Sequence, residues 1–387
     1  MWILLGLLTG CGPKVYTPPA ATEGHGLADE QGDHWGILEQ ASGLMDTSVR
    51  QRALFLMVRY RPEPAGGEWS ERGLHDPSPY VQRRSIEALG QRLDETESQD
   101  ALLRYIERPN VNPFNVAEAA LLLAPGAPAG LMEQLDKKLE ENRHHSEKAP
   151  IALAAARLGS TTATTILTEA LAKGDFPLEI NFFLRLGDTP IDGISEALVT
   201  GLPFFEEELH LPIAHTLIRL NHPLGQKLFS EALNSEDIEW QHEALDFLDS
   251  LHSPEATRLL KGASRPSKSH ATLLLERRDS DFPRAAEDSL ESPDRELRIQ
   301  ALWTLNTWSQ RFPEDKKSLK VIRKRAIELL RDLEASVQHA ALSLLGATGI
   351  PSDEKHLSPF LASEDPSHRV AAAGALLAIE VRTTSEP

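Results

Sequence analysis

The stretch Val81-Gln-Arg-Arg-Ser85-Ile86-Glu-Ala-Leu89-Gly90 decides the fold, because its pattern returns along most of the chain. It combines an apolar anchor at Val81, a small residue four positions later, an apolar residue at five, a leucine at eight and a helix stop at nine. The spacing i, i+4, i+5, i+8 is one stripe of an α-helix, and a small residue within the stripe lets a neighbouring helix approach closely. The stretch therefore predicts a helix that packs against another helix.

The same register recurs from an anchor at position 49 to one at position 369, about every 32 residues. The position four after the anchor is small in ten of the eleven copies, and the position eight after it is leucine in nine. Repetition at a fixed period of this size is the signature of stacked helical repeats. The anchors are Val49, Val81, Val116, Pro150, Leu178, Pro212, Trp240, Ser267, Leu297, Val337 and Arg369.

Each copy also has a second amphipathic segment before its anchor, such as residues 163–171 and 319–330. Turns such as Asp76-Pro77-Ser78 and Asp365-Pro366-Ser367 separate the two segments, since proline fixes φ and Asp or Ser caps the helix that follows. These features predict an all-α fold, a right-handed α-solenoid of about eleven antiparallel helix pairs. With helix layers about 9 Å apart, the stack forms an arc of roughly 100 Å. An ordinary helix bundle is the alternative, and eleven copies in one register disfavour it.

The pattern resembles the HEAT repeat, in the short bacterial form shared with the phycobilisome-lyase-like group. The resemblance covers residues 35–380 and is strongest over 76–90, 332–346 and 365–377. It implies that the second helix of each pair lines the inner, concave face. The tetratricopeptide pattern fits less well, because its Trp and Tyr positions do not recur here.

The N-terminal segment predicts where in the cell the protein is located. An apolar run ends in Leu8-Thr9-Gly10-Cys11, which resembles the lipobox of bacterial lipoproteins, although no Lys or Arg precedes the run. In this interpretation residues 1–10 are a signal peptide, residues 11–34 are the lipidated Cys11 and a flexible tether, residues 35–380 are the solenoid, and residues 381–387 are a disordered tail. The alternative is an apolar N-terminus of a cytosolic protein.

Composition limits the function classes. The 387 residues include 40 Lys+Arg against 58 Asp+Glu, a formal net charge of −18, which opposes coating of nucleic acid or of an anionic membrane. The single cysteine leaves no disulfide and no cysteine zinc site. No apolar run is long enough to predict a membrane-spanning helix.

Motifs for catalysis are missing from the sequence. We find neither a phosphate-binding glycine loop nor a Gly-x-Ser-x-Gly elbow, and the adjacent His144 and His145 do not share a helix face. A basic run over 316–325 is interpreted as a solvated outer helix face, with an anionic-ligand site as the alternative. We therefore predict no enzyme activity, no cofactor and no metal site.

One departure from the repeat pattern suggests a binding site. Seven positions after the anchor most copies are apolar or small, but three consecutive copies have Arg157, Arg185 and Arg219. Equivalent positions of stacked repeats line up, so these arginines are expected to form a ladder. A structural interpretation pairs them with carboxylates, and a functional one has them recognise an acidic peptide or polymer. The carboxylates considered for the pairing are Glu169, Glu179, Glu196 and Glu208.

The leading hypothesis is a lipid-anchored HEAT-repeat scaffold that binds a protein or peptide partner on its concave face. It is expected on the periplasmic side, at the outer membrane, because Gly12 rather than Asp follows Cys11. One alternative is a lyase-like or other enzyme built on HEAT-like repeats. Another is a nucleic-acid-binding helical solenoid, which the net charge opposes, so no nucleic acid partner is expected.

Overall fold

The computed structural model describes residues 34–61, 67–128, 130–141, 145–174, 180–188, 190–251, 253–262, 268–276, 279 and 281–385. These residues form 22 α-helices and four short 3₁₀ helices, with no strand among them. Within the same part of the chain, no helix has the length and hydropathy needed to cross a membrane.

The helices are arranged as eleven pairs, so the predicted all-α architecture of about eleven helix pairs is confirmed. The first helices of the pairs are α1 (His34–Ser42), α3 (Glu68–Leu74), α5 (Thr96–Glu107), α7 (Leu131–Glu141), α9 (Thr161–Lys173), α11 (Ile194–Gly201), α13 (Pro223–Leu233), α15 (Pro254–Lys261), α17 (Arg284–Ser289), α19 (Lys316–Leu329) and α21 (Glu354–Leu361). The second helices are α2 (Thr47–Tyr60), α4 (Pro79–Gly90), α6 (Pro113–Leu123), α8 (His145–Arg157), α10 (Ile180–Leu186), α12 (His210–Arg219), α14 (Ile238–Ser250), α16 (Lys268–Glu276), α18 (Arg295–Arg311), α20 (Ala335–Thr348) and α22 (Pro366–Ser385).

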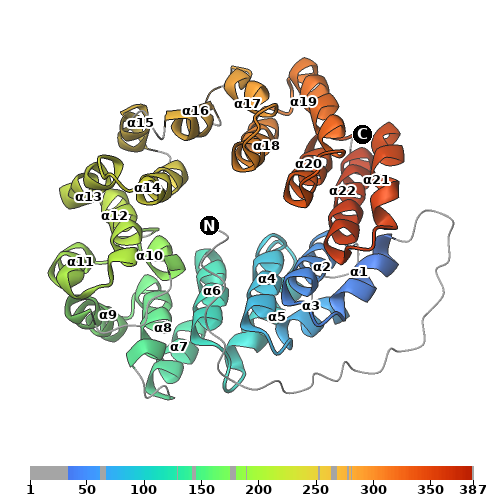
Figure 1. The fold of residues 1–387 in the computed structure, drawn as a ribbon. Helices are drawn as coiled ribbons and strands as arrows, with labels where there is room; N and C mark the ends of the chain where they lie inside the picture. The colour runs from blue at the N-terminus through green and yellow to red at the C-terminus, as the bar shows by residue number, and fades with distance from the viewer. Residues whose placement is uncertain are drawn as a thin grey trace.

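Burial supports the predicted register in all repeats but the last, which is shifted by one residue. Nine of the eleven anchors lie in the second helices, and the other two, Leu178 and Ser267, lie outside the described residues just before α10 and α16. All eleven positions four after an anchor are buried. Small side chains at these positions let neighbouring second helices pack closely, which is the contact that stacks the repeats. The second helices face the centre of the molecule in Figure 1, as the resemblance implied.

A recurring hydrogen bond from a side chain to the backbone, which we call the lock, fixes the turn before many second helices. The residue four after the N-cap donates to a backbone carbonyl six residues earlier: Arg50 Nη1 to Leu44 O at 2.7 Å, and Gln82 Nε2 to Asp76 O at 2.7 Å. Arg50 also makes a two-pronged pair with the buried Asp76 of the next repeat, at 2.7 and 3.1 Å. Each lock satisfies a carbonyl that the turn would otherwise leave unpaired.

The lock corrects the register in the last repeat. Arg369 Nη1 donates to Ser363 O at 2.7 Å, the same spacing that Arg50 makes, so Arg369 corresponds to Arg50 and not to the anchor Val49. The buried His368 therefore takes the anchor position that the sequence analysis gave to Arg369. The one-residue difference arises because α22 begins with Asp365 as its cap, where the cap accepts from Ser367 N at 2.8 Å.

The stack closes into a ring, which the expected arc did not include. The C-terminal helix α22 packs against α1 and α2, as Figure 1 shows at the junction of the blue and red helices. Residues Val370, Ala373 and Leu377 belong to the same apolar core as the N-terminal helices. We call this junction the seam. Closure of eleven repeats needs a rotation of about 33° per repeat, which a solenoid with this curvature supplies.

Close packing holds the seam together. A Cβ built on Gly374 of α22 would lie 2.8 Å from Leu56 Cδ1 of α2 and 3.6 Å from its Cγ, so the glycine lets the two helices approach. Arg52 Nη2 of α2 donates to Ser343 Oγ of α20 at 3.3 Å. The seam thus has the close helix contact that the internal repeat interfaces have.

The domain boundaries need one correction at the C-terminus. Residues 381–385 are helical, so the expectation of a disordered tail over 381–387 is wrong for these five. The reason is Arg382, whose guanidinium donates to the end of the preceding second helix, to Gly346 O at 3.1 Å, to Gly349 O at 2.7 Å and to Ala347 O. The signal peptide over 1–10 and the tether, apart from His34, lie outside the described residues.

The seam predicts a cross-link between residues far apart in the sequence. With Cys11→Ser to remove the native thiol, the pair Leu56→Cys and Gly374→Cys should form a disulfide on mild oxidation, because a Cβ at position 374 lies 3.6 Å from Leu56 Cγ, the atom that the sulfur at position 56 replaces. A non-reducing gel measures the shift in mobility. The pair Leu56→Cys and Lys227→Cys is the control, since α13 lies on the opposite side of the ring (Figure 1). Equal mobility of the oxidised and reduced first pair would show that the ring is open.

Candidate functional site

The three predicted arginines meet on the inner rim of the ring. Arg157 ends α8, Arg185 lies next to the end of α10, and Arg219 ends α12. Each is in the last turn of its helix, where the unpaired carbonyls favour a cation. The expected ladder is therefore present, and we call Arg157, Arg185 and Arg219 with their carboxylates the arginine cluster.

A single carboxylate joins the three guanidinium groups. Asp188 Oδ1 lies 2.6 Å from Arg219 Nη1, and Asp188 Oδ2 lies 3.6 Å from both Arg157 Nη2 and Arg185 Nη1. A Cβ on the preceding Gly187 would lie 3.2 Å from Arg219 Cβ and Cδ, so glycine lets α12 approach this turn. Asp188 thereby connects three consecutive repeats.

Arg157 has a structural role in the cluster. Its side chain is only 9% exposed, and its Nη2 donates to the backbone carbonyl of Arg185. Burial lowers the pKa of Arg157, Asp188 opposes this shift, and the neighbouring cation of Arg185 adds to it. A buried guanidinium needs such partners, because a charge taken from water without them is costly.

Arg185 pairs with a second, buried carboxylate. Glu118 of α6 is 7% exposed and accepts from Arg185 through both oxygens, with Nε to Oε2 at 3.2 Å. Burial lowers the pKa of Arg185, but the charges and hydrogen bonds of Glu118 and Asp188 outweigh it and raise the pKa overall. Three guanidinium groups thus share two carboxylates, so the cluster carries one net positive charge.

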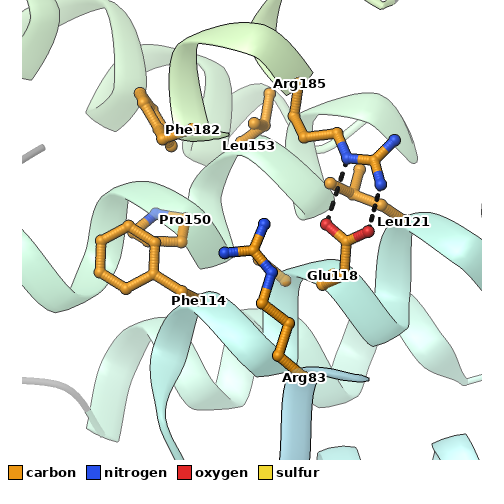
Figure 2. A pocket seen from close by; sticks show the side chains of 9 residues that line it. Arg83, Phe114, Glu118, Leu121, Pro150, Leu153, Phe182 and Arg185 are labelled. Carbon is orange, nitrogen blue, oxygen red and sulfur yellow. Dashed lines mark hydrogen bonds and ion pairs between the residues drawn. The ribbon is translucent and has the colours of Figure 1, made fainter. Parts of the chain in front are cut away.

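A small hollow that is open to solvent lies beside the cluster. Figure 2 shows Arg83 and Arg185 on either side of Glu118, with Phe114, Pro150 and Phe182 forming an apolar wall. The hollow is lined by Arg83, Phe114, Ala117, Glu118, Leu121, Pro150, Leu153, Phe182 and Arg185. This lining offers guanidinium donors next to apolar surface, which suits a ligand that has a carboxylate beside an apolar group.

A buried histidine borders the cluster without adding charge to it. His215 of α12 shares a hydrogen bond with Ser250 Oγ through Nε2, at 2.8 Å. Burial, followed by the cation of Arg219, lowers the pKa of His215 to about 4. His215 is therefore neutral at pH 7, and the positive charge of this region belongs to the arginines.

The carboxylate partners differ from those considered in the sequence analysis. Among the described residues, the three arginines pair with Asp188 and Glu118. Glu169 lies 3.9 Å from Lys173 instead. Glu179 lies outside the described residues, and Glu196 and Glu208 are not in these pairs.

Two signals for the true partners were present in the sequence. Asp188 follows Arg185 by three positions, directly after the glycine that stops the helix. Glu118 interrupts the otherwise apolar run from Val116 to Leu123. A charge in such a run predicts a buried partner of opposite sign, because an unpaired buried carboxylate would be unstable.

The basic run over 316–325, which lies in α19, forms ion pairs with carboxylates. Examples are Arg323 with Asp353 at 3.2 Å and Arg325 with Glu328 at 3.1 Å. This agrees with an outer helix face. Leu8, Thr9, Gly10 and Cys11 lie outside the described residues, as does His144.

Comparison with known proteins identifies no family. No family model and no curated protein matches the chain. The solved structures that match include an engineered protein, with 18% identity over 81% of this chain and 95% of that chain, at a TM-score of 0.23. The karyopherin Kap121p, bound to the extreme C-terminus of the protein phosphatase Cdc14p, is 13% identical, and the match covers 89% of this chain and 41% of the karyopherin at a TM-score of 0.30. The UNC-45 chaperone is 14% identical, and the match covers 90% of this chain and 47% of the chaperone at a TM-score of 0.24.

The chain spans less than half the length of the karyopherin and chaperone chains it matches. At these TM-scores the likeness adds nothing to the fold assignment, which rests on the helix pairs and their contacts. The protein is a helical-repeat protein on that ground.

The shared carboxylate predicts a loss of stability. Asp188→Asn removes the charge that three guanidinium groups share and leaves the buried Arg157 without its carboxylate. We expect the free energy of unfolding to fall by about 2 kcal/mol in urea titrations followed by circular dichroism. Asp192→Asn, an exposed change in the same connection, is the control and should stay within about 0.5 kcal/mol of wild type. Equal unfolding midpoints for the two variants would contradict the shared role of Asp188.

Proposed function

We propose that this protein is a lipid-anchored HEAT-repeat scaffold whose inner rim binds a short segment of a protein partner. The segment has one or two carboxylates next to a leucine or phenylalanine. The observation that carries the proposal is the exposure of two cations of the cluster, one of which lines an apolar hollow: the side chains of Arg185 and Arg219 are 43% and 38% exposed, and Arg185 lines the hollow. Arg157 stays outside the binding surface, because it is buried.

Arg219 is the main contact in this proposal. A guanidinium has five N–H donors, and the pairs described above involve one nitrogen of Arg219 but all three of Arg185. A carboxylate that reaches Arg219 gains a charge-assisted hydrogen bond without displacing Glu118. An apolar side chain of the same segment then enters the hollow beside Arg185, against the wall of Phe114 and Phe182.

The net charge of the chain limits the partner. At −18 the protein repels a large acidic domain, so long-range attraction does not bring such a partner to the rim. A short segment brings few charges and makes its contacts within a few ångströms, where the local positive charge acts.

The proposed anchor is the lipid on Cys11. It rests on the sequence Leu8-Thr9-Gly10-Cys11 and places the protein on the periplasmic side of the outer membrane. A tether over 12–34 has a root-mean-square reach on the order of 25 Å, enough to hold the ring clear of the lipid headgroups.

Peptide binding tests the proposed surface. A fluorescein-labelled peptide of alternating leucine and glutamate should raise fluorescence polarisation with the Cys11→Ser protein, and Arg219→Ala should weaken its affinity at least tenfold through the lost charged contact. The same peptide with glutamine for glutamate should bind at least tenfold more weakly to the parent protein. Arg284→Ala, an exposed arginine on α17, is the control. Equal affinities for the two arginine variants, with unchanged thermal melts, would refute the surface.

The anchor has a separate test. Cys11→Ala removes the thiol that would receive the lipid, so the mutant should move from the membrane fraction to the soluble fraction or accumulate as an unprocessed precursor. Fractionation followed by mass spectrometry of the N-terminus measures this. If wild type and mutant are both soluble and have the same N-terminus, the proposed lipid anchor is wrong. That result would leave the proposed peptide site untouched.

A further inference from the structure

Two histidines and an aspartate meet between the last two second helices, close to the seam. His339 lies in α20, His368 lies in α22, and Asp365 caps the start of α22. One nitrogen or oxygen atom from each of the three lies within 4.8 Å of the others. The two imidazole rings have their centroids 4.3 Å apart at an angle of 55°.

The hydrogen bonds of this group are incomplete. His368 is 8% exposed, and its Nδ1 lies 2.9 Å from Asp365 Oδ2. Its Nε2 is buried without a hydrogen-bond partner, and so is Nε2 of His339. Buried polar atoms in native proteins are nearly always satisfied, so two such nitrogens side by side point to a ligand.

The protonation of His339 suits a metal ligand. Burial, followed by the charges of His368 and Arg52, lowers its pKa to about 4, so the ring is neutral at pH 7. Neutral imidazole is the form that binds metal ions. Arg52 of α2 would repel a dication, and the carboxylate of Asp365 opposes that effect from within the group.

A second histidine pair in the ring shows the contrast. His242 and His270 have ring centroids 5.2 Å apart. Both ring nitrogens of His270 are engaged, Nδ1 with Gln300 Oε1 at 2.7 Å and Nε2 with Asp246 Oδ1 at 2.8 Å. In that pair both ring nitrogens of His270 have protein partners, whereas His339 and His368 each have a buried Nε2 without one.

We propose that His339, His368 and Asp365 bind a divalent transition metal ion of the zinc class. Zn²⁺ takes both imidazole nitrogen and carboxylate oxygen as ligands, and three protein ligands leave a fourth position for water. Metal–nitrogen bonds of about 2.0–2.1 Å place tetrahedral ligand atoms roughly 3.4 Å apart. The three ligand atoms lie within 4.8 Å of one another, so they need to close by up to about 1.4 Å. The sequence alone predicts no such site, since its ligands come from two repeats.

The metal ion would join the last two repeats. It would bridge α20 and α22, and α22 is the helix that packs against α1 and α2 at the seam. Binding to the folded ring and not to the unfolded chain raises thermal stability. This inference is independent of the peptide site, which lies on α4 to α12.

Zn²⁺ titration of the chelator-treated full chain tests the site. Isothermal calorimetry at pH 7 should give one equivalent with a Kd in the micromolar range or below, and the melting temperature should rise with Zn²⁺. His339→Ala and Asp365→Asn should each weaken binding at least tenfold. The second variant keeps an oxygen that can accept from Ser367 N, so the cap of α22 is preserved. Co²⁺ in place of Zn²⁺ should give the absorption bands of a four-coordinate ion.

His242→Ala is the matched control and should bind Zn²⁺ as the wild type does, because it alters the other histidine pair, in which hydrogen bonds already engage both ring nitrogens of His270. No binding of Zn²⁺ up to millimolar concentration would overturn the proposal. So would wild-type affinity in both His339→Ala and Asp365→Asn, or an equal loss in the control. Asp365→Asn keeps the test valid if His339→Ala does not fold.

Discussion

The packing of α22 against α1 and α2 is the contact on which the rest of the molecule depends. A linear stack of helix pairs has two apolar ends, which other repeat proteins cover with polar capping repeats. Here each end covers the other, through a core that contains both Val49 and Leu377. The ring therefore buries its ends without caps and holds the second helices on a fixed inner rim (Figure 1).

The inner rim gathers polar groups from separate repeats into defined sites. At the arginine cluster, Asp188 satisfies cations from three second helices, and Glu118 reaches Arg185 past the helix between them. These pairs stabilise the rim, and the guanidinium groups of Arg185 and Arg219 remain partly exposed. A site that both joins repeats and presents cations is well held in place, because Glu118 is buried and Asp188 contacts all three guanidinium groups.

The candidate site was predictable only in part. Arg157, Arg185 and Arg219 occupy equivalent positions of consecutive repeats, and stacking brings equivalent positions together whatever the details of packing. Their carboxylates follow no such rule. Asp188 lies in a turn and Glu118 lies two repeats before Arg185, so the pairing depends on the curvature of the stack and on side-chain rotamers. The register of α22 was likewise one residue off, because its cap decides where the helix begins.

The sequence by itself determined the eleven helix pairs, the small residues of their packing stripe and the alignment of the three arginines. These features depend on contacts within a repeat or between neighbours, which a local pattern encodes. Only the tertiary structure decided that the arc closes at Leu56 and Gly374, that Asp188 serves three arginines, and that His339 meets His368. Closure is the sum of eleven small rotations, and no single repeat specifies that sum in its own residues.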